Sequence, residues 1–393
     1  MRYYLSEGFV LKRIETPCLY DIRGDELYEL DEEGFSFLLS CSGPEGCVLD
    51  DSSGEFVDYC ISRGILTENP VYAGRPPLRS APAPSLRYLE FQITDKCNLK
   101  CRHCYVGESR NREMSISKCK AVLDEFEAMQ GLRLLITGGE PLMHSHFPEL
   151  NRLLPKYGFR KILFSNGLLL NQKYIAELHV DELQISIDGM EHGHDAVRGK
   201  GTFRKAVKAV GEVIDAGMQV SVATMVHREN LSEFDEMEGL FRGLGIREWT
   251  VDVPCVEGNL KDNSSLWVDP EIGGRFFKYG YGGGLHGGER GFGCGLHLAA
   301  VLAGGEICKC AFYHDRPDGN VMEGLAAAWE RIRPVDLKAL DCTRVSCAVL
   351  DECRGGCRFR AAAVSGDFQG TDHAVFGAER DLYKCAYYGI KVE

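Results

Sequence analysis

The sequence predicts an α/β protein whose central region is a partial parallel barrel of six strand–helix units, fewer than the eight of a closed TIM-like barrel. Segment 86–93 is apolar and β-prone, and segment 116–129 follows it with helical periodicity and good helix formers. This alternation continues to about residue 254, as expected for parallel strands joined by helices. The later predicted strands are 132–137, 161–165, 182–187, 219–225 and 248–253.

A proline-rich linker at 72–85 separates this barrel from a small α+β region at 1–71. Prolines remove amide donors and hold their neighbours in extended shapes, so the linker is not expected to continue either region. Within the small region the sequence predicts strands at 9–14, 19–22 and 26–30, a turn at 23–25, and helices at 33–41 and 54–63.

A second boundary is expected in the glycine-dense stretch 273–295. Eight of the seventeen cysteines lie from residue 286 onward, which predicts a cysteine-rich region at 286–393 after a barrel at 86–285. The odd cysteine total would leave one unpaired in a disulfide framework, whereas clustering indicates metal and therefore a reducing compartment.

The charge balance limits the partners. The 393 residues carry a net charge of −13 without a basic block, which disfavours nucleic acid but leaves a neutral or basic peptide open. No stretch reaches the ~18 apolar residues of a membrane helix, and the first residues lack the apolar core of a signal peptide. We therefore expect a cytoplasmic protein that uses neither nucleic acid nor a membrane.

Cys97, Cys101 and Cys104 gather three thiols in one short loop with the spacing C-x3-C-x2-C. Three cysteines are one short of a closed zinc site, but they can bind three irons of a cubane cluster and leave the fourth iron open. A zinc knuckle that borrows a ligand such as His103 is the alternative. The loop follows the first predicted strand, where α/β barrels place reactive groups. Spacing and position together indicate a reactive iron–sulfur site.

The run Thr137-Gly-Gly-Glu-Pro141 follows the second predicted strand. This motif, combined with the cysteine loop after the first strand, resembles the radical S-adenosylmethionine (radical SAM) superfamily. The resemblance implies a 4Fe-4S cluster on the cysteine triad, with S-adenosylmethionine (SAM) at its open iron. The methionine part of SAM would then lie along Gly138, Gly139, Glu140 and Pro141. Glycines allow close backbone approach, and carbonyls and Glu140 can accept hydrogen bonds from the SAM ammonium.

The same resemblance implies further contacts with SAM. Asn166 and Ser186 end the third and fourth predicted strands, where family members place polar groups near the ribose and the carboxylate. His103 occupies the usual aromatic position of the family and is expected to pack on adenine. We interpret His194 and Arg198 as structural.

The cysteines beyond residue 293 resemble the SPASM extension of radical SAM peptide and protein maturases, which usually carries two auxiliary 4Fe-4S clusters. The resemblance implies one cluster on Cys342, Cys347, Cys353 and Cys385. It implies another on Cys294, Cys310 and Cys357, with Cys308 or Cys255 as a fourth ligand, or else an open iron. Four residues, rather than the usual two, separate Cys342 from Cys347, and a zinc ribbon is the non-iron alternative. The other cysteines are predicted to be buried apolar residues: Cys18, Cys41, Cys47, Cys60 and Cys119.

The first 71 residues, strands followed by helices, resemble the winged-helix-like precursor-recognition domain of peptide-modifying pathways such as pyrroloquinoline quinone biosynthesis. Such a module offers a sheet edge to which an extended leader peptide can add a strand. An unrelated capping domain is the alternative. The resemblance implies two partners, a precursor peptide substrate and a low-potential electron donor such as ferredoxin or flavodoxin.

Together these features predict a radical SAM/SPASM maturase that cleaves SAM to a 5′-deoxyadenosyl radical and abstracts hydrogen from a ribosomally made peptide, installing a crosslink or related modification. Alternatives are maturation of an enzyme active-site residue, as in anaerobic sulfatases, and tetrapyrrole or small-molecule chemistry. A multi-cluster electron-transfer protein is the non-enzyme alternative, but it leaves the motif at 137–141 unexplained. No catalytic base is assigned, and Glu90, Gln92, Asp188 and Tyr313 are expected only to reach the cavity.

Overall fold

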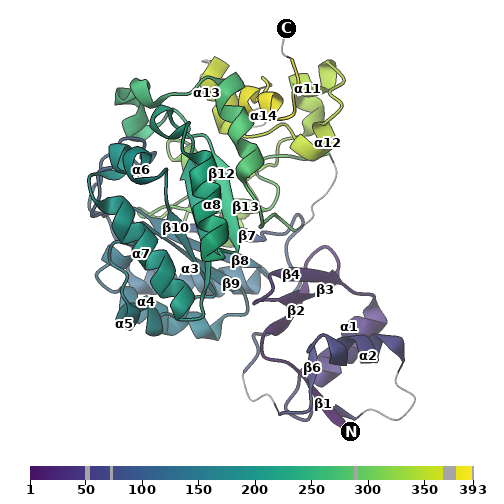
Figure 1. Cartoon of the computed structure of the whole chain (residues 1–393). Helices are drawn as coiled ribbons and strands as arrows, with labels where there is room; N and C mark the ends of the chain where they lie inside the picture. Colours follow the sequence, from purple (N-terminus) through teal and green to yellow (C-terminus); the bar gives the residue numbers. More distant parts are fainter. Residues whose placement is uncertain (49–53, 71–73, 287–290, 366–377, 392–393) are drawn as a thin grey trace.

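The computed structural model describes residues 1–48, 54–70, 74–286, 291–365 and 378–391. Its three parts are stacked, with the small N-terminal region below the central sheet and the cysteine-rich region above it (Figure 1). In the described residues, no helix is long and apolar enough to cross a membrane.

Six parallel strands form the predicted partial barrel, and they lie in the order β12-β11-β10-β9-β8-β7. Their bounds are β7 (Tyr88–Thr94), β8 (Arg133–Gly138), β9 (Arg160–Ser165), β10 (Glu182–Ser186), β11 (Gln219–Met225) and β12 (Glu248–Asp252). The helices between and after them are α3 (Ile116–Ala128), α4 (Phe147–Leu153), α5 (Gln172–Ala176), α6 (Glu191–Arg198), α7 (Thr202–Asp215), α8 (Phe234–Leu244) and α9 (Pro270–Gly273). The predicted six-unit alternation is therefore confirmed.

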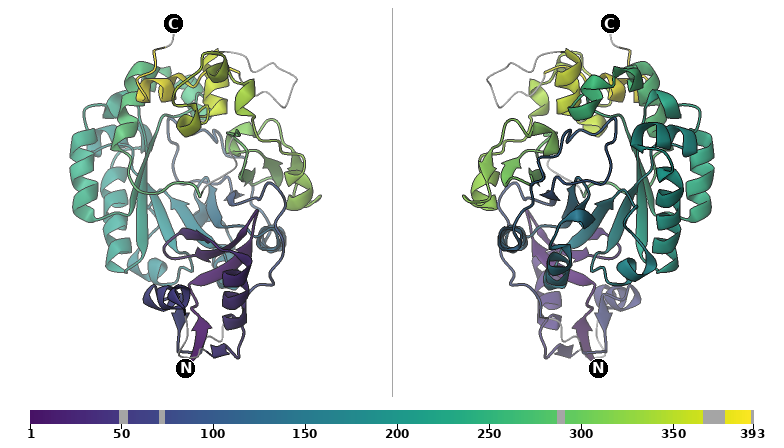
Figure 2. Two further views of the ribbon diagram at one scale, coloured as in Figure 1. Left: turned by 90° about the vertical axis from the view of Figure 1, so that its right-hand side faces the viewer. Right: turned by 90° about the vertical axis from the view of Figure 1, so that its left-hand side faces the viewer.

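The two faces of this sheet differ in exposure. On β8, Leu134 and Ile136 are buried in the core beneath the helices, whereas Leu135 and Thr137 on the opposite face are half-buried. The same alternation recurs on β10, β11 and β12, where Thr250 is exposed. Helices cover the outer face of the curved sheet (Figure 2), and the half-buried side chains lie on the opposite, concave face.

The sheet continues beyond the predicted barrel. Strand β13 (Leu298–Val301) pairs in parallel with β7, and β14 (Glu306–Cys308) and β15 (Gly319–Asn320) follow as antiparallel neighbours. The cysteine-rich region thus shares the barrel sheet, and the boundary at 285 stays a prediction. The remaining helices are α10 (Leu325–Trp329), α11 (Asp341–Arg344), α12 (Leu350–Cys353), α13 (Arg358–Ser365) and α14 (Leu382–Tyr387).

The small N-terminal region has two three-stranded sheets, ordered β2-β3-β4 and β5-β1-β6. The predicted elements are confirmed as β2 (Phe9–Arg13), β3 (Pro17–Asp21), β4 (Glu26–Glu29), α1 (Glu32–Cys41) and α2 (Glu55–Ser62). The strands that the sequence did not predict are β1 (Arg2–Leu5), β5 (Cys47–Val48) and β6 (Leu66–Thr67). Two of these have only two residues each, too few to show a period-2 pattern.

The cysteines outside the predicted metal groups have two fates. Cys18, Cys60 and Cys119 are free and buried, as predicted. Cys41 is buried, as predicted, whereas Cys47 is only half-buried. The two form a disulfide that joins the end of α1 to β5, a bond that the sequence did not predict. The two cysteines are six positions apart in the sequence. The turn after α1, which the sequence pattern did not define, brings them together.

The β3–β4 turn docks the small region onto the barrel. Asp25 forms an ion pair with Arg133 at 2.8 Å, and the fully buried Arg160 donates to the Ile22 carbonyl oxygen at 2.6 Å. Arg133 and Arg160 begin β8 and β9, so the turn contacts the barrel at the amino ends of its strands. The cysteine triad follows the carboxyl end of β7, which places it at the opposite end of the barrel.

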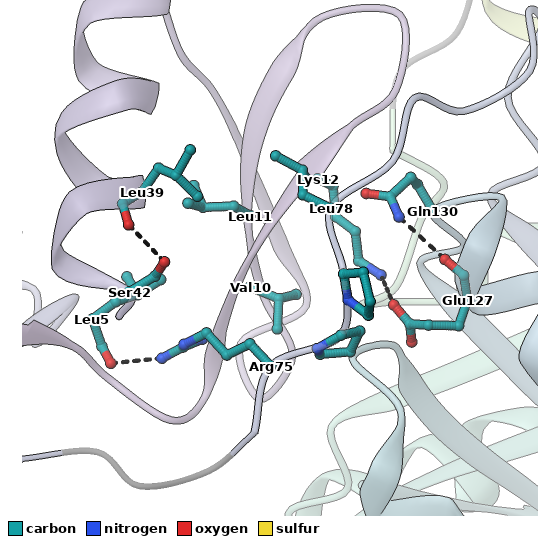
Figure 3. Close-up of a pocket in the computed structure, with 12 residues that line it drawn as sticks. Leu5, Val10, Leu11, Lys12, Leu39, Ser42, Arg75, Leu78, Glu127 and Gln130 are labelled. Atoms are coloured by element: carbon teal, nitrogen blue, oxygen red, sulfur yellow. Dashed lines mark hydrogen bonds and ion pairs between the residues drawn. The ribbon is translucent and has the colours of Figure 1, made fainter. Parts of the chain in front are cut away.

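A cavity of roughly 100 Å³ lies where the small region, the linker and α3 meet (Figure 3). Lys12 reaches across it to a buried ion pair with Glu127 at 3.0 Å. Arg75 of the linker donates to backbone carbonyls on the other side, including that of Leu5 at 2.6 Å. These contacts hold the small region at a defined place on the barrel.

Candidate functional site

The cysteine loop and the glycine motif emerge side by side. The loop begins where β7 ends and the motif begins where β8 ends, and these two strands are parallel neighbours. The Gly139 N–H donates to the Thr94 carbonyl at 2.9 Å, and the Glu140 N–H donates to the Lys96 carbonyl at 2.8 Å. A Cβ on Gly138, whose φ is +146°, would lie 2.1 Å from the Thr94 oxygen. The glycines are therefore required by backbone packing against the cysteine loop.

A second segment, which the sequence did not indicate, supports the loop from its other side. Asn259 contacts the loop twice. Its backbone N–H donates to the Cys104 carbonyl and its side-chain Nδ2 donates to the Cys101 carbonyl, both at 2.9 Å. A Cβ on Gly258 would lie 2.3 Å from the Cys104 oxygen. Asparagine and glycine are common in turns, so this role left no distinctive signal in the sequence.

The three thiols of the triad suit an iron–sulfur cluster. Burial, together with the charges of Cys104 and Cys97, raises the pKa of Cys101 to about 11, although Arg198 acts to lower it. The Cys101 thiol therefore holds its proton until a metal displaces it. The Leu99 N–H is directed at the Cys97 sulfur at 3.4 Å, as amides are toward cluster sulfurs. In the described residues, no three His, Cys, Asp or Glu side chains are grouped closely enough to hold a single metal ion.

Glu140 turns its carboxylate into the protein. It has no exposed surface, and it accepts the Asn166 N–H at 2.8 Å and the Ser165 hydroxyl at 3.1 Å. Burial raises the pKa of Glu140 to about 7, although these hydrogen bonds act to lower it. The residue thus ties the motif to the end of β9, and its contact with the SAM ammonium stays a prediction.

The other predicted SAM contacts lie around the same rim. Asn166 donates from its amide to the Asn98 side chain of the cysteine loop at 2.7 Å. Ser186 is the last residue of β10 and is half-buried on the concave face. Pro141 is buried and begins a short 3-10 helix, Pro141–Met143. The structure brings these residues to one edge, and their roles toward SAM stay predictions.

His103 contacts a buried carboxylate. Its Nε2 lies 3.2 Å from Asp188 Oδ2, and Asp188 also accepts from the Arg198 guanidinium and from the Met225 N–H at 2.8 Å. Although burial acts to raise it, Arg198 and His103 hold the pKa of Asp188 well below its usual range. In the described structure His103 Nδ1 is buried without a hydrogen-bond partner, so it is available to a group bound beside the triad. His194 accepts the Asp188 N–H, and the interpretation of His194 and Arg198 as structural stays a prediction.

The predicted ligands of one auxiliary cluster line a single small cavity: Cys342, Cys347, Cys353 and Cys385. Cys342 lines it despite the unusual spacing to Cys347. The pKa of Cys385 is raised to about 11, first by burial and then by the charges of Cys342 and Cys353. The donor set, four cysteines around one space, fits a 4Fe-4S cluster.

The other auxiliary group consists of Cys294, Cys310 and Cys357. After burial, the charge of Cys357 raises the pKa of Cys294, and the charges of Cys294 and Cys357 raise the pKa of Cys310. Cys255 joins it, because a hydrogen bond between Cys255 and Cys357 raises the pKa of Cys255 and lowers that of Cys357. The pKa of Cys308 is instead raised by burial and then by neighbouring carboxylates, of which Asp318 has the largest effect. Cys255 is therefore the better placed of the two candidate fourth ligands.

Arg360 joins the cysteine-rich region to the barrel, a role that the sequence did not reveal. It is buried and pairs with Asp381 at 2.7 Å and with Asp252, at the end of β12, at 2.6 Å. Asp381 also accepts the Cys357 N–H at 2.8 Å. This network fixes the auxiliary cysteine loops relative to the barrel strands.

Comparison with known proteins agrees with this arrangement. The Radical SAM superfamily model matches residues 91–241. The mycofactocin maturase MftC of Mycolicibacterium smegmatis is 30% identical over 302 residues, covering 68% of this chain and 77% of that protein. An AdoMet-dependent heme synthase of Oleidesulfovibrio alaskensis is 32% identical over 177 residues, covering 43% of this chain and 46% of that protein.

Two solved structures show the same fold. Streptococcus suis SuiB bound to its precursor peptide SuiA matches with a TM-score of 0.68 at 15% identity, over 98% of this chain and 100% of that chain. Native anSMEcpe with bound AdoMet and Cp18Cys peptide matches with a TM-score of 0.59 at 18% identity, over 78% of this chain and 96% of that chain. The relation to MftC over two thirds of both chains, together with the match to the superfamily model, shows that the chain belongs to the radical SAM superfamily.

Proposed function

We propose that the protein is a radical SAM maturase that abstracts hydrogen from a ribosomally made peptide and installs a crosslink or a related modification. One observation carries this proposal: the fold match to SuiB extends over 98% of the chain, and so includes the small N-terminal region that SAM cleavage does not require. The relation to MftC, named a maturase, supports the same class of reaction.

The cofactor supplies the reactive species, and the chain supplies its surroundings. When bound, the 4Fe-4S cluster and SAM provide a 5′-deoxyadenosyl radical that takes a substrate hydrogen. Cys97, Cys101 and Cys104 hold the cluster, and His103 and Asn166 orient SAM at the rim. The concave face of the sheet holds the substrate C–H nearby and excludes water. A low-potential donor such as ferredoxin or flavodoxin delivers the electron.

The leader of the precursor adds to the open edge of β4. Strand β4 is paired antiparallel with β3, and the Leu30 N–H that follows β4 donates to the Pro17 carbonyl of β3. Because the direction of the amides alternates along a strand, the N–H groups of Leu27 and Glu29 point away from β3. The opposite edge, β2, bridges to Ser80 of the linker at Arg13. Strand β4 therefore offers the backbone donors and acceptors that an extended peptide needs.

The auxiliary groups complete the redox equipment. Cys342, Cys347, Cys353 and Cys385 hold one auxiliary 4Fe-4S cluster. Cys294, Cys310, Cys357 and Cys255 hold the other and give it four protein ligands, which leaves no open iron for the substrate.

Tetrapyrrole chemistry receives weaker support. The heme synthase relative aligns with 43% of the chain, which is little more than the span of the superfamily model. Such a span accounts for SAM cleavage but not for the two flanking regions.

A proline substitution tests the leader role without disturbing the barrel. Deleting the small region would be a poor test, because it would remove the Asp25 carboxylate from the half-buried Arg133 and the buried Arg160. Glu29→Pro removes one outward amide of β4, whereas Glu29→Ala keeps it. With a short peptide encoded next to the gene as the precursor, we expect Glu29→Pro to lose binding by titration and Glu29→Ala to retain it. Equal binding by the two variants would refute the leader site.

A further inference from the structure

Glu90 is a carboxylate on the concave face that the site described above does not use. It lies within β7 and is half-buried, whereas Leu89 and Phe91 on either side point into the core and are fully buried. The register pairs Glu90 with Leu135 on β8 and with Ala300 on β13. Both neighbours are apolar, so no cation flanks this carboxylate within the sheet.

The carboxylate lies between the two cysteine groups that face the cavity. Its Oε2 accepts the N–H of Ala311, the residue after Cys310, at 2.9 Å. On the other side is Tyr105, the residue after Cys104: burial, and then the charge of Glu90, raises the Tyr105 pKa. Glu90 therefore lies between the triad and the auxiliary cysteines, where a substrate must present its C–H.

The arginines on the barrel strands are engaged elsewhere. Arg133 pairs with Asp25 at 2.8 Å, and Arg160 pairs with Glu182 at 2.5 Å. Burial without a nearby cation raises the pKa of Glu90, and the Ala311 N–H only partly opposes this effect. A half-buried carboxylate with one hydrogen bond is stabilised when a cation approaches its free oxygen.

We propose that Glu90 is the anionic half of a subsite that receives a basic side chain, lysine or arginine, of the peptide substrate. The inference rests on the proposed peptide-maturase function. A cation bound there places the adjoining peptide backbone between Cys104 and Cys310. The net charge of −13 favours association with such a basic segment.

The conservative variant Glu90→Gln separates the two roles that Glu90 can have. Glutamine keeps an oxygen that accepts the Ala311 N–H, but it removes the charge. Glu248→Gln is the matched control, because Glu248 is another half-buried carboxylate on the concave face, at the start of β12. The probe is the fluorescently labelled precursor peptide, bound anaerobically to the reconstituted full-length enzyme and followed by anisotropy. Each lysine and arginine of the peptide is replaced in turn by methionine.

We expect one basic position at which replacement weakens binding to the wild type and to Glu248→Gln about tenfold or more. Glu90→Gln should bind the native peptide as weakly as the wild type binds the peptide with that position replaced. Replacing the position should not weaken the binding of Glu90→Gln any further. If every basic position has the same effect in wild type and Glu90→Gln, the inference is overturned. It is also overturned if the native peptide has no basic residue outside the leader. A wild type that does not bind the precursor refutes the peptide function itself, and this is visible before any variant is compared.

Discussion

A methyl group on Gly139 would lie 2.4 Å from the backbone oxygen of Lys96, the residue before the first cysteine of the triad. The glycine motif and the cysteine loop, which read as two independent signals in the sequence, are thus one packed unit. Whatever displaces the motif also displaces Cys97.

Gly139→Ala should therefore remove the triad cluster. We expect the reconstituted variant to lose about four of about twelve irons per chain, by cubane stoichiometry, and to form no 5′-deoxyadenosine. Iron and sulfide quantitation with electron paramagnetic resonance measures this loss. Gly211→Ala is the control, because a Cβ there meets open space on α7. Full iron content in Gly139→Ala would contradict the packing argument.

Glu140 should make the stability of the protein depend on pH in a window below neutrality. Its pKa is about 7 in the folded state and 4.5 as the ordinary value, so the folded state retains a proton that the unfolded state releases. The free energy of unfolding should fall as pH rises from 4.5 to 7. Denaturant titrations of the metal-free protein should show a shallower fall in Glu140→Gln. Glu236→Gln, an exposed change on α8, should keep the wild-type slope, and an unchanged slope in Glu140→Gln would rule out this role.

Arg360 should be essential for docking the cysteine-rich region. Arg360→Leu leaves the buried Asp381 without its cation, which costs about 3–5 kcal/mol. We expect limited proteolysis to cleave the variant after residue 290 while the barrel resists. Lys208→Ala breaks an exposed pair with Glu212 and should cost less than about 0.5 kcal/mol. A protease-resistant Arg360→Leu would show that the network is dispensable.

Cys255 and Cys308 should differ as cluster ligands. Cys255→Ser removes the thiol hydrogen-bonded to Cys357, so we expect lower iron content or an altered auxiliary-cluster spectrum. Cys308→Ser changes a buried thiol among carboxylates and should leave iron and spectrum unchanged. The opposite pattern would assign Cys308 as the ligand.

Local patterns carried most of the predicted fold. The six barrel strands, the helices between them and the main elements of the small region follow from hydrophobic periodicity and turn residues. The triad and the motif at 137–141 could be placed at one edge because parallel neighbouring strands end there. The four cysteines around one cavity likewise follow their predicted grouping.

Long-range pairings could not be predicted in the same way. Strand β13 pairs with β7 although about two hundred residues of chain separate the two strands, and only four pairs of residues make the contact. Asp25 is an ordinary turn residue in the sequence, and nothing in the local pattern indicates its ion pairs with Arg133 and Arg160. Glu140 accepts hydrogen bonds from Asn166 and Ser165 at the end of the neighbouring strand β9, and the sequence pattern of neither segment indicates this pairing.

The proposed function requires that the radical takes hydrogen from a peptide. Its most direct test is an anaerobic reaction of reconstituted enzyme, SAM, reductant and a precursor peptide deuterated in its core, followed by mass spectrometry of both products. We predict deuterium in 5′-deoxyadenosine together with a mass change in the peptide, and neither in a variant lacking Cys97, Cys101 and Cys104. Formation of 5′-deoxyadenosine without deuterium, beside an unchanged peptide, would contradict the proposal.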